Sequence, residues 1–352
     1  MYLTERKRNT GLWPPAAADS AKLPALSPRA GSGLESQELP LSLNHLPPFP
    51  AVALRALQLA SDANTRLREL HEVIRTDPAF SSELLRIANS PLYGIRVEIK
   101  NTLQATMLLG FDRVKALALT IGLRTYLGHC LEMPALRACW RHSLASAILA
   151  EELAPLDFLA GDLEPGGCSA PADMVLSQVD PGASRSRISK YALNVDPYAL
   201  PDKGEAYTAA ILHDVGRLSL AVLRSQEYAS VLERTENAPR DLLQCERELF
   251  GMDHCQAGRA LALAWNFPKN IVEVITRHHE ALEPGGRNLL ALVQFSCRLA
   301  DALGFCVGYS PDSPTYEALC GRMSAAARRY FGSDADQTAF RLACRINKIE
   351  SV

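Results

Sequence analysis

The sequence predicts an all-α protein, and three observations carry this prediction. Apolar residues recur at spacings of three and four along most of the chain, which is the period of an amphipathic helix. Strand-like alternation is scarce, and only the short stretch 95–99 is expected to be extended. Helix-start and helix-stop residues, such as the pair Asp77-Pro78 and Gly110, fall at the ends of the periodic segments.

The first part of the chain is predicted to contain six helices. Asp77 can cap the third helix, Asp112 starts the fifth, and Asn89-Ser90-Pro91 ends the third because proline removes a backbone donor. The sixth helix is strongly amphipathic and carries His142. The expected ranges are 51–60, 64–75, 78–88, 102–109, 112–126 and 134–154.

Helical spacing resumes at residue 205 and continues to the end of the chain. Each segment is bounded by glycine, proline or a capping residue. The expected ranges are 205–213, 216–223, 227–233, 242–250, 255–265, 269–279, 288–303, 314–320, 325–331 and 336–347.

Two segments lack a periodic apolar face. Residues 1–45 are rich in Pro, Ala, Ser and Gly and are predicted to be a disordered arm. Residues from about 157 to 203 are rich in Gly, Pro, Ser and Asp and are predicted to be a mostly disordered insertion, with a short element near 174–179. Residues 46–349, which include this insertion, are expected to form the folded domain.

Composition narrows the class of protein. The net charge is −2, so no global basic field is available to hold a nucleic acid. The nine cysteines form no Cys-x-x-Cys pair, which favours buried thiols in a reducing compartment. No apolar run is long enough to cross a membrane and no signal peptide is recognisable. We therefore expect a cytoplasmic protein with no membrane partner.

A series of histidines and aspartates is the strongest functional signal. Five of the eight histidines fall in it, and two aspartates accompany them. Imidazole and carboxylate ligands together suit divalent Mn, Fe, Mg or Zn. The alternative is a set of buried polar residues that bond to one another and to the backbone. The candidate metal ligands are His142, His213, Asp214, His254, His278, His279 and Asp301.

The order of these residues resembles that of the HD superfamily of metal-dependent phosphohydrolases. Several further motifs are similar to those of the HDOD family, the HD-related output domains of bacterial signalling proteins. These motifs are Leu46-Pro47-Pro48-Phe49-Pro50, Asp77-Pro78-Ala79-Phe80, Leu85-Arg86-Ile87-Ala88-Asn89-Ser90, Leu108-Leu109-Gly110, Leu212-His213-Asp214-Val215-Gly216 and Trp265-Asn266-Phe267-Pro268. The resemblance covers about residues 46 to 303.

The resemblance implies a two-lobed helical bundle, with an N-terminal lobe over 46–127 and an HD-phosphohydrolase-like lobe over 134–349. It also implies a regulatory output role more often than catalysis, although this chain keeps a full ligand set. Cyclic di-GMP phosphodiesterases of the related HD-GYP class carry a lysine after His-Asp-x-Gly and a later Gly-Tyr-Pro segment. Here Arg217 follows the first motif, and the second is absent after His279-Glu280. Arginine can bind phosphate, but it does not replace lysine in reach or proton chemistry.

Two functions therefore stand side by side. The leading expectation is a signal-transduction output protein that acts through contacts with signalling proteins, gated by a divalent metal or a nucleotide ligand, with no catalytic residues. The alternative is a metal-dependent phosphodiesterase acting on a cyclic nucleotide or phosphoester, with His213, Asp214 and Arg217 as its catalytic residues. No organic cofactor and no direct nucleic-acid contact are expected.

Two spatial expectations follow from the resemblance. His142, His213, Asp214 and Asp301 should converge despite the insertion between the first two. The second expectation concerns the junction of the lobes. Four apolar side chains of the N-terminal lobe should pack against the HD-like lobe, namely Leu103, Met107, Leu108 and Phe111.

Overall fold

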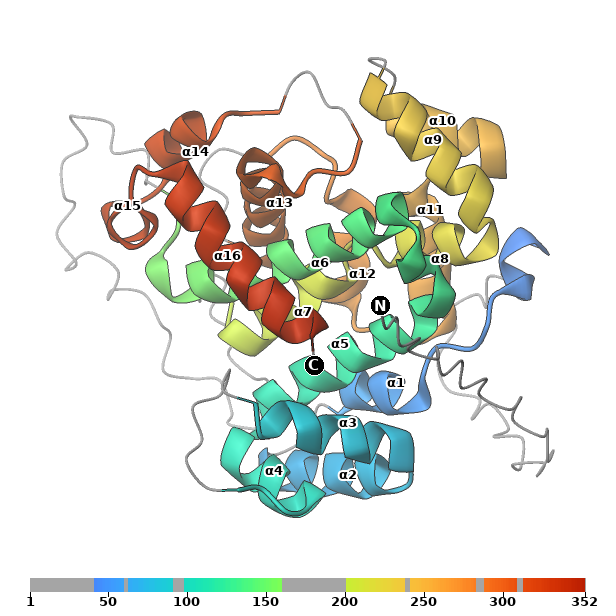
Figure 1. The fold of residues 1–352 in the computed structure, drawn as a ribbon, viewed down its shortest axis with the longest axis vertical. Helices are drawn as coiled ribbons and strands as arrows, with labels where there is room; N and C mark the ends of the chain where they lie inside the picture. Colours follow the sequence, from blue (N-terminus) through green and yellow to red (C-terminus); the bar gives the residue numbers. More distant parts are fainter. Residues whose placement is uncertain are drawn as a thin grey trace, which may run out of the picture. The chain divides into compact units, whose positions relative to one another are not determined.

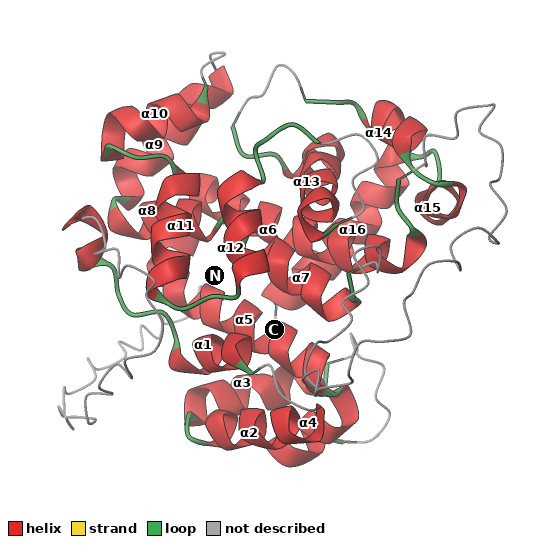
Figure 2. Cartoon of the chain, turned by 180° about the vertical axis from the view of Figure 1, so that it is seen from behind, coloured by secondary structure: helices red, strands yellow, loops and turns green. Residues whose placement is uncertain are grey.

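The computed structural model describes residues 41–59, 63–90, 98–159, 201–237, 241–282, 288–308 and 313–351, and its regular elements there are helices. Within these ranges no strand forms, and the only β-type pairing is an isolated bridge between Leu159 and Met323. Figure 2 shows the same result, since every regular element is drawn as a helix. The all-α prediction is confirmed.

Within the described residues, the N-terminal lobe contains five α-helices around a core of its own. Figure 1 shows α2, α3 and α4 gathered beside α1 and one end of the long α5. The core is formed by aliphatic residues such as Leu70, Leu84 and Val114, which are fully buried. The helices are α1 (Ala51–Gln58), α2 (Ala63–Arg75), α3 (Pro78–Ala88), α4 (Thr102–Leu109) and α5 (Phe111–Leu127).

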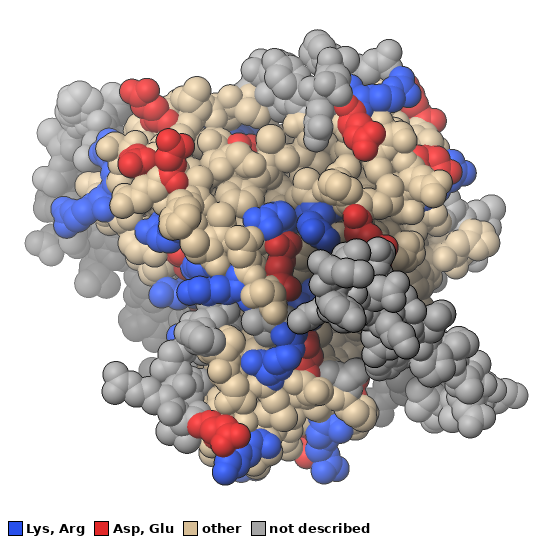
Figure 3. All heavy atoms as spheres, in the orientation of Figure 1, with Lys and Arg blue, Asp and Glu red and all other residues tan. Residues whose placement is uncertain are grey.

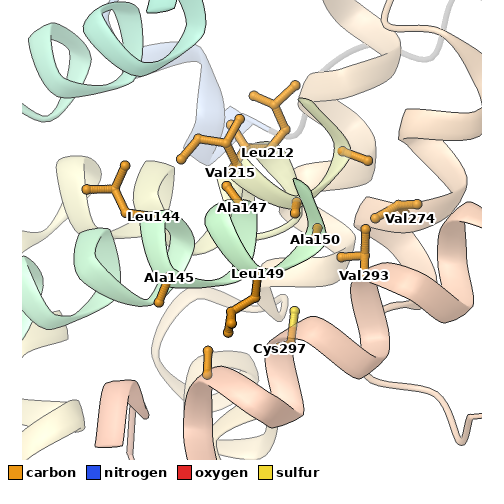
Figure 4. Packing of buried hydrophobic residues seen from close by; sticks show 14 of the residues in the cluster. Leu144, Ala145, Ala147, Leu149, Ala150, Leu212, Val215, Val274, Val293 and Cys297 are labelled. Atoms are coloured by element: carbon orange, nitrogen blue, oxygen red, sulfur yellow. The ribbon is translucent and has the colours of Figure 1, made fainter. Parts of the chain in front are cut away.

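The second lobe is built around α6 (Pro134–Leu153). This helix packs against α7 (Lys203–Leu212) and α13 (Leu289–Ala300), and Figure 4 shows their side chains interleaved in the core. Three further helices of this lobe pack against α6 or against one another. They are α8 (Val215–Leu223), α11 (His254–Ala264) and α12 (Lys269–Arg277).

The peripheral helices cover this core. Arg345 on α16 bonds to Glu151 and Glu152 on α6, and Arg141 on α6 bonds to Glu350, so ion pairs hold α16 along α6. These helices are α9 (Ser225–Asn237), α10 (Leu242–Phe250), α14 (Tyr316–Arg322), α15 (Ala325–Phe331) and α16 (Ala335–Glu350). Short 3₁₀ or π turns occur at η1 (Leu41–His45), η3 (Gly128–Glu132), η4 (Ala154–Leu156) and η5 (Asp301–Phe305).

Local capping explains why the helices begin where the sequence predicts. The Asp77 side chain accepts a hydrogen bond from the Phe80 amide, and Pro78 occupies the first helical position. Asp253 and Gln256 form a reciprocal capping box at the start of α11. Asn89, after α3, donates to the carbonyls of Leu85 and Ile99 and accepts from the Ile99 amide. This one side chain therefore ties the end of α3 to the chain that enters α4.

The junction between the lobes runs along α1 and α5. The Phe49 ring stacks on Trp265 at 4.8 Å between centroids, and Trp265 meets Tyr126 edge-on. The Tyr126 hydroxyl donates to Ser219 on α8, and Thr120 and Tyr207 share a hydrogen bond between α5 and α7. Aromatic packing and buried hydroxyls thus join the two lobes.

The expectation that α4 faces the second lobe is wrong. Leu103, Met107 and Leu108 are 48%, 68% and 51% exposed, and Phe111 packs against the core of its own lobe. The reason is the composition of α4, whose sequence Thr-Leu-Gln-Ala-Thr-Met-Leu-Leu is apolar on several faces. Helical spacing cannot choose a buried face in such a segment, and the residues that are buried are Ala105, Thr106 and Leu109.

The boundaries of the two nonperiodic segments lie partly within the described chain. Residues 41–45, which the sequence analysis assigned to the arm, form a 3₁₀ helix whose Leu43 is 2% exposed. Phe158 and Leu159, at the start of the predicted insertion, are buried as well. Residues 1–40 and 160–200, with the element expected near 174–179, lie outside the described residues, as does most of the stretch 95–99.

Among the described helices, none combines the length and the apolar character required to span a bilayer.

Candidate metal centre

The His213-Asp214 pair occupies the sharp corner between α7 and α8. His213 ends α7 and Asp214 precedes the first residue of α8, so both side chains point into the interior. Gly216 makes the corner possible, because a Cβ at this position would lie 1.9 Å from the His254 carbonyl oxygen and 2.5 Å from the Gly258 amide. The glycine of His-Asp-x-Gly thus lets α8 approach α11 closely enough to bring His254 beside the pair.

The insertion does not separate His142 from the pair. His142 lies on α6, and its ring centroid is 5.3 Å from that of His213. Its Nδ1 lies 3.2 Å from Asp301 Oδ1, at the start of η5. His213 in turn is 4.9 Å from His278, between ring centroids. The predicted convergence of His142, His213, Asp214 and Asp301 is therefore present in the structure.

A hydrogen bond from Nδ1 orients four of the imidazole rings in the same way. A backbone carbonyl only accepts hydrogen bonds, so the ring nitrogen beside it carries the proton. His213 Nδ1 donates to the Ala210 carbonyl at 2.6 Å, His278 Nδ1 to Ile275 at 3.0 Å, and His142 Nδ1 to Phe305 at 2.9 Å. His254 Nδ1 donates to a carboxylate of Glu246 at 2.7 Å. A neutral ring in this orientation has its lone pair on Nε2, as in metal-binding histidines. Burial works against charge on these rings, but Asp301 raises the pKa of His142 well above its usual range and Cys297 raises the pKa of His213, so without an ion both rings favour a second proton on Nε2.

Asp214 lies between these nitrogens. Its Oδ1 is 3.4 Å from His254 Nε2 and 3.3 Å from His278 Nε2, and its Oδ2 is 3.5 Å from His213 Nε2. The carboxylate is completely buried, and neither oxygen receives an aligned hydrogen bond among the described residues. A buried carboxylate in such a position needs a cation nearby.

Arg217 supplies one cation from within the chain. Its Nε lies 3.0 Å from Asp214 Oδ2, and its Nη2 lies 3.3 Å from His254 Nε2 and 3.5 Å from His279 Nε2. The guanidinium is 4% exposed. We call His254, His278, His279 and Arg217 the arginine half of the centre. There, a permanent positive charge lies against imidazole nitrogens that would otherwise be free to bind metal.

Two residues of the centre escaped sequence reasoning because they lie on other helices. Glu246, on α10, is fully buried and accepts from the His254 amide at 2.8 Å as well as from its ring. The Tyr228 hydroxyl on α9 donates to the same carboxylate at 2.5 Å. The two residues lie on the neighbouring helices α9 and α10, and no sequence spacing links either of them to His254.

Cys297 is a third residue of the centre that the sequence did not reveal, because the scattered cysteines predicted only buried thiols. It lies on α13, four residues before Asp301, and Figure 4 shows it among the core side chains. Its sulfur and one ring nitrogen each of His142 and His213 all lie within 4.8 Å of one another. The spacing Cys297-x-x-x-Asp301 was the available signal, because residues four apart share a helix face.

Burial and neighbouring charges together set the pKa values of the buried groups. Burial alone would raise the pKa of Asp214, but Arg217 and then His213 hold it well below its usual range. Burial lowers the pKa of His278 to about 4, so this ring is neutral at pH 7. Burial alone would raise the pKa of Cys297, but His213 and His142 outweigh this effect and lower it to about 7. The centre therefore holds ionised Asp214 beside neutral His278.

The residues present fit a divalent cation. Asp214 is buried and lacks aligned donors, and the Nε2 atoms of the surrounding histidines are turned inward with their protons on the opposite nitrogen. His142, His213, Asp214 and Asp301 are the residues that would hold such an ion. A bound divalent cation at such a centre supplies Lewis acidity and lowers the pKa of a water ligand.

An all-helical lobe with a buried histidine–aspartate cluster at a helix corner defines an HD-related protein. The chain belongs to the HDOD family, because the model of the HDOD domain matches residues 46–159 and 191–281. No curated protein matches the sequence.

Solved structures share this fold at low sequence identity. An "HDOD domain protein with unknown function" from Geobacter sulfurreducens is 22% identical, with a TM-score of 0.57 over 87% of this chain and 91% of that chain. A "Putative signal transduction protein" from Marinobacter aquaeolei VT8 is 21% identical, with a TM-score of 0.58 over 88% of this chain and 59% of that chain. A "Putative phosphohydrolase" from Shewanella amazonensis SB2B is 19% identical, with a TM-score of 0.54 over 88% and 94%.

Proposed function

We propose that this protein is a signal-transduction output domain that works through contacts with other signalling proteins and does not hydrolyse phosphoesters. The observation that carries the proposal is the position of Arg217, whose Nη2 lies 3.3 Å from His254 Nε2. Two-metal hydrolases need a second cation about 3.5–4 Å from the first. In this chain a tethered guanidinium takes the place beside the nitrogens that would bind it.

Burial of the centre supports the same proposal. His213, Asp214, Arg217 and His254 are each at most 4% exposed, so a phosphoester has little access to the guanidinium. The name of the Marinobacter protein, which refers to signal transduction, agrees with an output role.

The exposed face of α4 is the type of surface that a protein partner covers. Leu103, Met107 and Leu108 leave three large apolar side chains in solvent. On the face seen in Figure 3, basic and acidic side chains are interspersed with uncharged ones, which suits a protein partner better than a nucleic acid.

The second candidate is a metal-dependent phosphodiesterase. The retained ligand set favours it, with Asp214 oxygens at its centre that receive no aligned hydrogen bond from the described residues, and the Shewanella protein is named a putative phosphohydrolase. In this case Arg217 would bind a phosphate oxygen, as a guanidinium can.

One experiment separates the two candidates. The full chain is incubated with Mn²⁺, Mg²⁺ or Zn²⁺ and with cyclic dinucleotides or bis(p-nitrophenyl) phosphate, and proteins captured from a lysate of the source cells are quantified in parallel. The comparison variants are Asp214→Asn and, as a control away from the centre, the partly buried Arg345→Met. Hydrolysis by the wild type that Asp214→Asn abolishes would overturn the output proposal. The output proposal is supported if the wild type hydrolyses no more than Asp214→Asn does. It also requires that a signalling protein is captured and that Asp214→Asn, but not Arg345→Met, changes the amount captured.

A further inference from the structure

Cys297 faces the end of the centre that Arg217 does not reach. Its sulfur belongs to a compact group with the imidazoles of His142 and His213, in which the three ligand atoms lie within 4.8 Å of one another. The three residues are 8%, 6% and 1% exposed, and they come from three helices, α13, α6 and the end of α7. The output role proposed above makes no use of this thiol.

The hydrogen bonds around the two imidazoles decide which nitrogen is available to an ion. His142 and His213 both donate through Nδ1 to backbone carbonyls, so Nε2 is the nitrogen that each ring has left for a further partner. A cation bound between them would contact the sulfur and both nitrogens together and would displace the protons that these groups otherwise share.

We propose that Cys297, His142 and His213 bind a thiophilic divalent cation, with Zn²⁺ as its natural occupant, and that a carboxylate oxygen of Asp214 or Asp301 completes the coordination. Zinc takes cysteine and histidine in four-coordinate sites, whereas a sulfur ligand disfavours Mg²⁺ and Mn²⁺. The sequence alone left Mn, Fe, Mg and Zn open, and the sulfur of Cys297 favours Zn among these four. This inference goes beyond the proposed function, since an output domain can act with or without a bound ion.

Asp214 is the better placed of the two carboxylates. Asp301 lies one helical turn after Cys297, but its Oδ1 is 3.2 Å from His142 Nδ1, on the side of the ring opposite Nε2. Asp214 Oδ2 lies 3.5 Å from His213 Nε2. The Asp214 oxygens are buried and receive no aligned hydrogen bond from the described residues. Binding an ion would give them the close contact that the fold does not supply.

A second sulfur-containing group competes for the same ion. Cys255 lies near His254, His278 and His279, with ligand atoms again within 4.8 Å of one another. Arg217 decides between the two groups, because its guanidinium contacts the nitrogens of His254 and His279. A divalent cation in that group would be repelled by a fixed positive charge a few ångströms away. The group around Cys297 is therefore the favoured one.

Cobalt titration of the metal-free full chain tests the assignment. A sulfur ligand to Co²⁺ produces a charge-transfer band in the near ultraviolet, which oxygen and nitrogen ligands do not. We expect the wild type to show this band with one equivalent of Co²⁺ and to lose it when Zn²⁺ is added. Cys255→Ser should keep the band, and Cys297→Ser should lose it and bind Zn²⁺ at least about tenfold more weakly. Far-ultraviolet circular dichroism establishes that each variant is folded.

A measurement on the wild type keeps the test independent of any variant. X-ray absorption of the Zn²⁺-loaded full chain should show one sulfur neighbour at about 2.3 Å together with nitrogen or oxygen neighbours. The same spectrum on Cys255→Ser should be unchanged. Zn²⁺ bound without sulfur, a band lost in Cys255→Ser instead of Cys297→Ser, or no binding of either metal would each overturn the proposal.

Discussion

Arg217 Nε lies 3.0 Å from Asp214 Oδ2, one helical turn away at the start of α8, and both side chains are almost completely buried. The pair places a charged group of each sign in the interior of the second lobe. The guanidinium also contacts His254, so it joins the carboxylate to the histidines of the arginine half. The stability of the lobe and the charge of the centre are therefore linked through one side chain.

Removal of the arginine should destabilise the metal-free protein. Arg217→Met keeps much of the side-chain volume but leaves Asp214 as a buried carboxylate without its cation, and such a change costs about 3–5 kcal/mol. Urea unfolding measures the loss. Added Zn²⁺ should recover part of it, because a bound ion replaces the missing charge.

The control for this variant is Arg345→Met, whose side chain is 34% exposed and pairs with Glu151 and Glu152. Its cost should be at most about 1 kcal/mol. The double variant Arg217→Met, Asp214→Asn should be more stable than the sum of the single changes predicts, since both remove the same pair. Strict additivity would show that the two side chains do not interact in solution.

The carboxylate of Glu246 should be required to orient His254. It accepts hydrogen bonds from the His254 ring, the His254 amide and the Tyr228 hydroxyl. Glu246→Gln turns a charged acceptor into an amide and should cost about 1.5–3 kcal/mol for the weakened charge-assisted bonds. Tyr228→Phe removes one donor and should cost about 1 kcal/mol.

Nitrogen NMR of the imidazoles checks the orientation separately from stability. In the wild type, the proton of His254 should be on Nδ1, and Glu246→Gln should shift it at least partly to Nε2. A variant that loses stability but keeps the Nδ1 proton would argue against the orienting role of Glu246.

The close approach of α8 and α11 predicts a steep penalty at Gly216. A Cβ there would meet the His254 carbonyl at 1.9 Å, and this backbone atom cannot rotate away. Gly216→Ala should cost at least about 3 kcal/mol, at or above the upper end of the usual range for overpacking. The matched control is Gly321→Ala on the exposed side of α14, where nothing lies within 4 Å of the added carbon.

Gly321→Ala should stabilise the protein by about 0.4–1 kcal/mol, because alanine restricts the unfolded chain and suits a helix. Thermal unfolding of both variants at one pH compares them directly. Equal effects at the two glycines would mean that α8 can move away from α11 without loss.

The junction between the lobes should weaken in alkali. Burial raises the pKa of Tyr126 to about 12, whereas the unfolded chain ionises near 10. Below pH 10 both states keep the phenol proton, and the stabilising contribution is complete. Between pH 10 and 12 the unfolded state loses the proton first, so the free energy of unfolding should fall as pH rises, by up to about 2–3 kcal/mol from this group.

Urea unfolding at pH 9 and pH 11 measures the slope. Tyr126→Phe should lower the stability at pH 9, since it removes the hydrogen bond to Ser219, and should reduce the loss between the two pH values. An unchanged slope in Tyr126→Phe would show that other groups cause the alkaline loss.

Much of the fold is determined by local sequence. Asp77 with Pro78, Asn101, Asp253 and Asn288 each cap the helix that follows, and these bonds span three residues or fewer. Local chemistry of this kind is legible without a tertiary structure, so the helix boundaries could be predicted to within a few residues. The order of histidines and aspartates likewise identified the residues that meet at the α7–α8 corner.

Tertiary structure alone decided the buried faces and the partners of each charge. In α4 the apolar residues surround the helix, so periodicity could not show that Met107 points to solvent and Ala105 to the core. Cys297 and Glu246 joined the centre because α13 and α10 bring them next to histidines far away in the sequence. Arg217 likewise contacts His254 and His279 because α11 and the end of α12 pack beside α8. Capping and periodicity act over a few residues, whereas burial and electrostatic pairing depend on distances between helices, and only packing determines those distances.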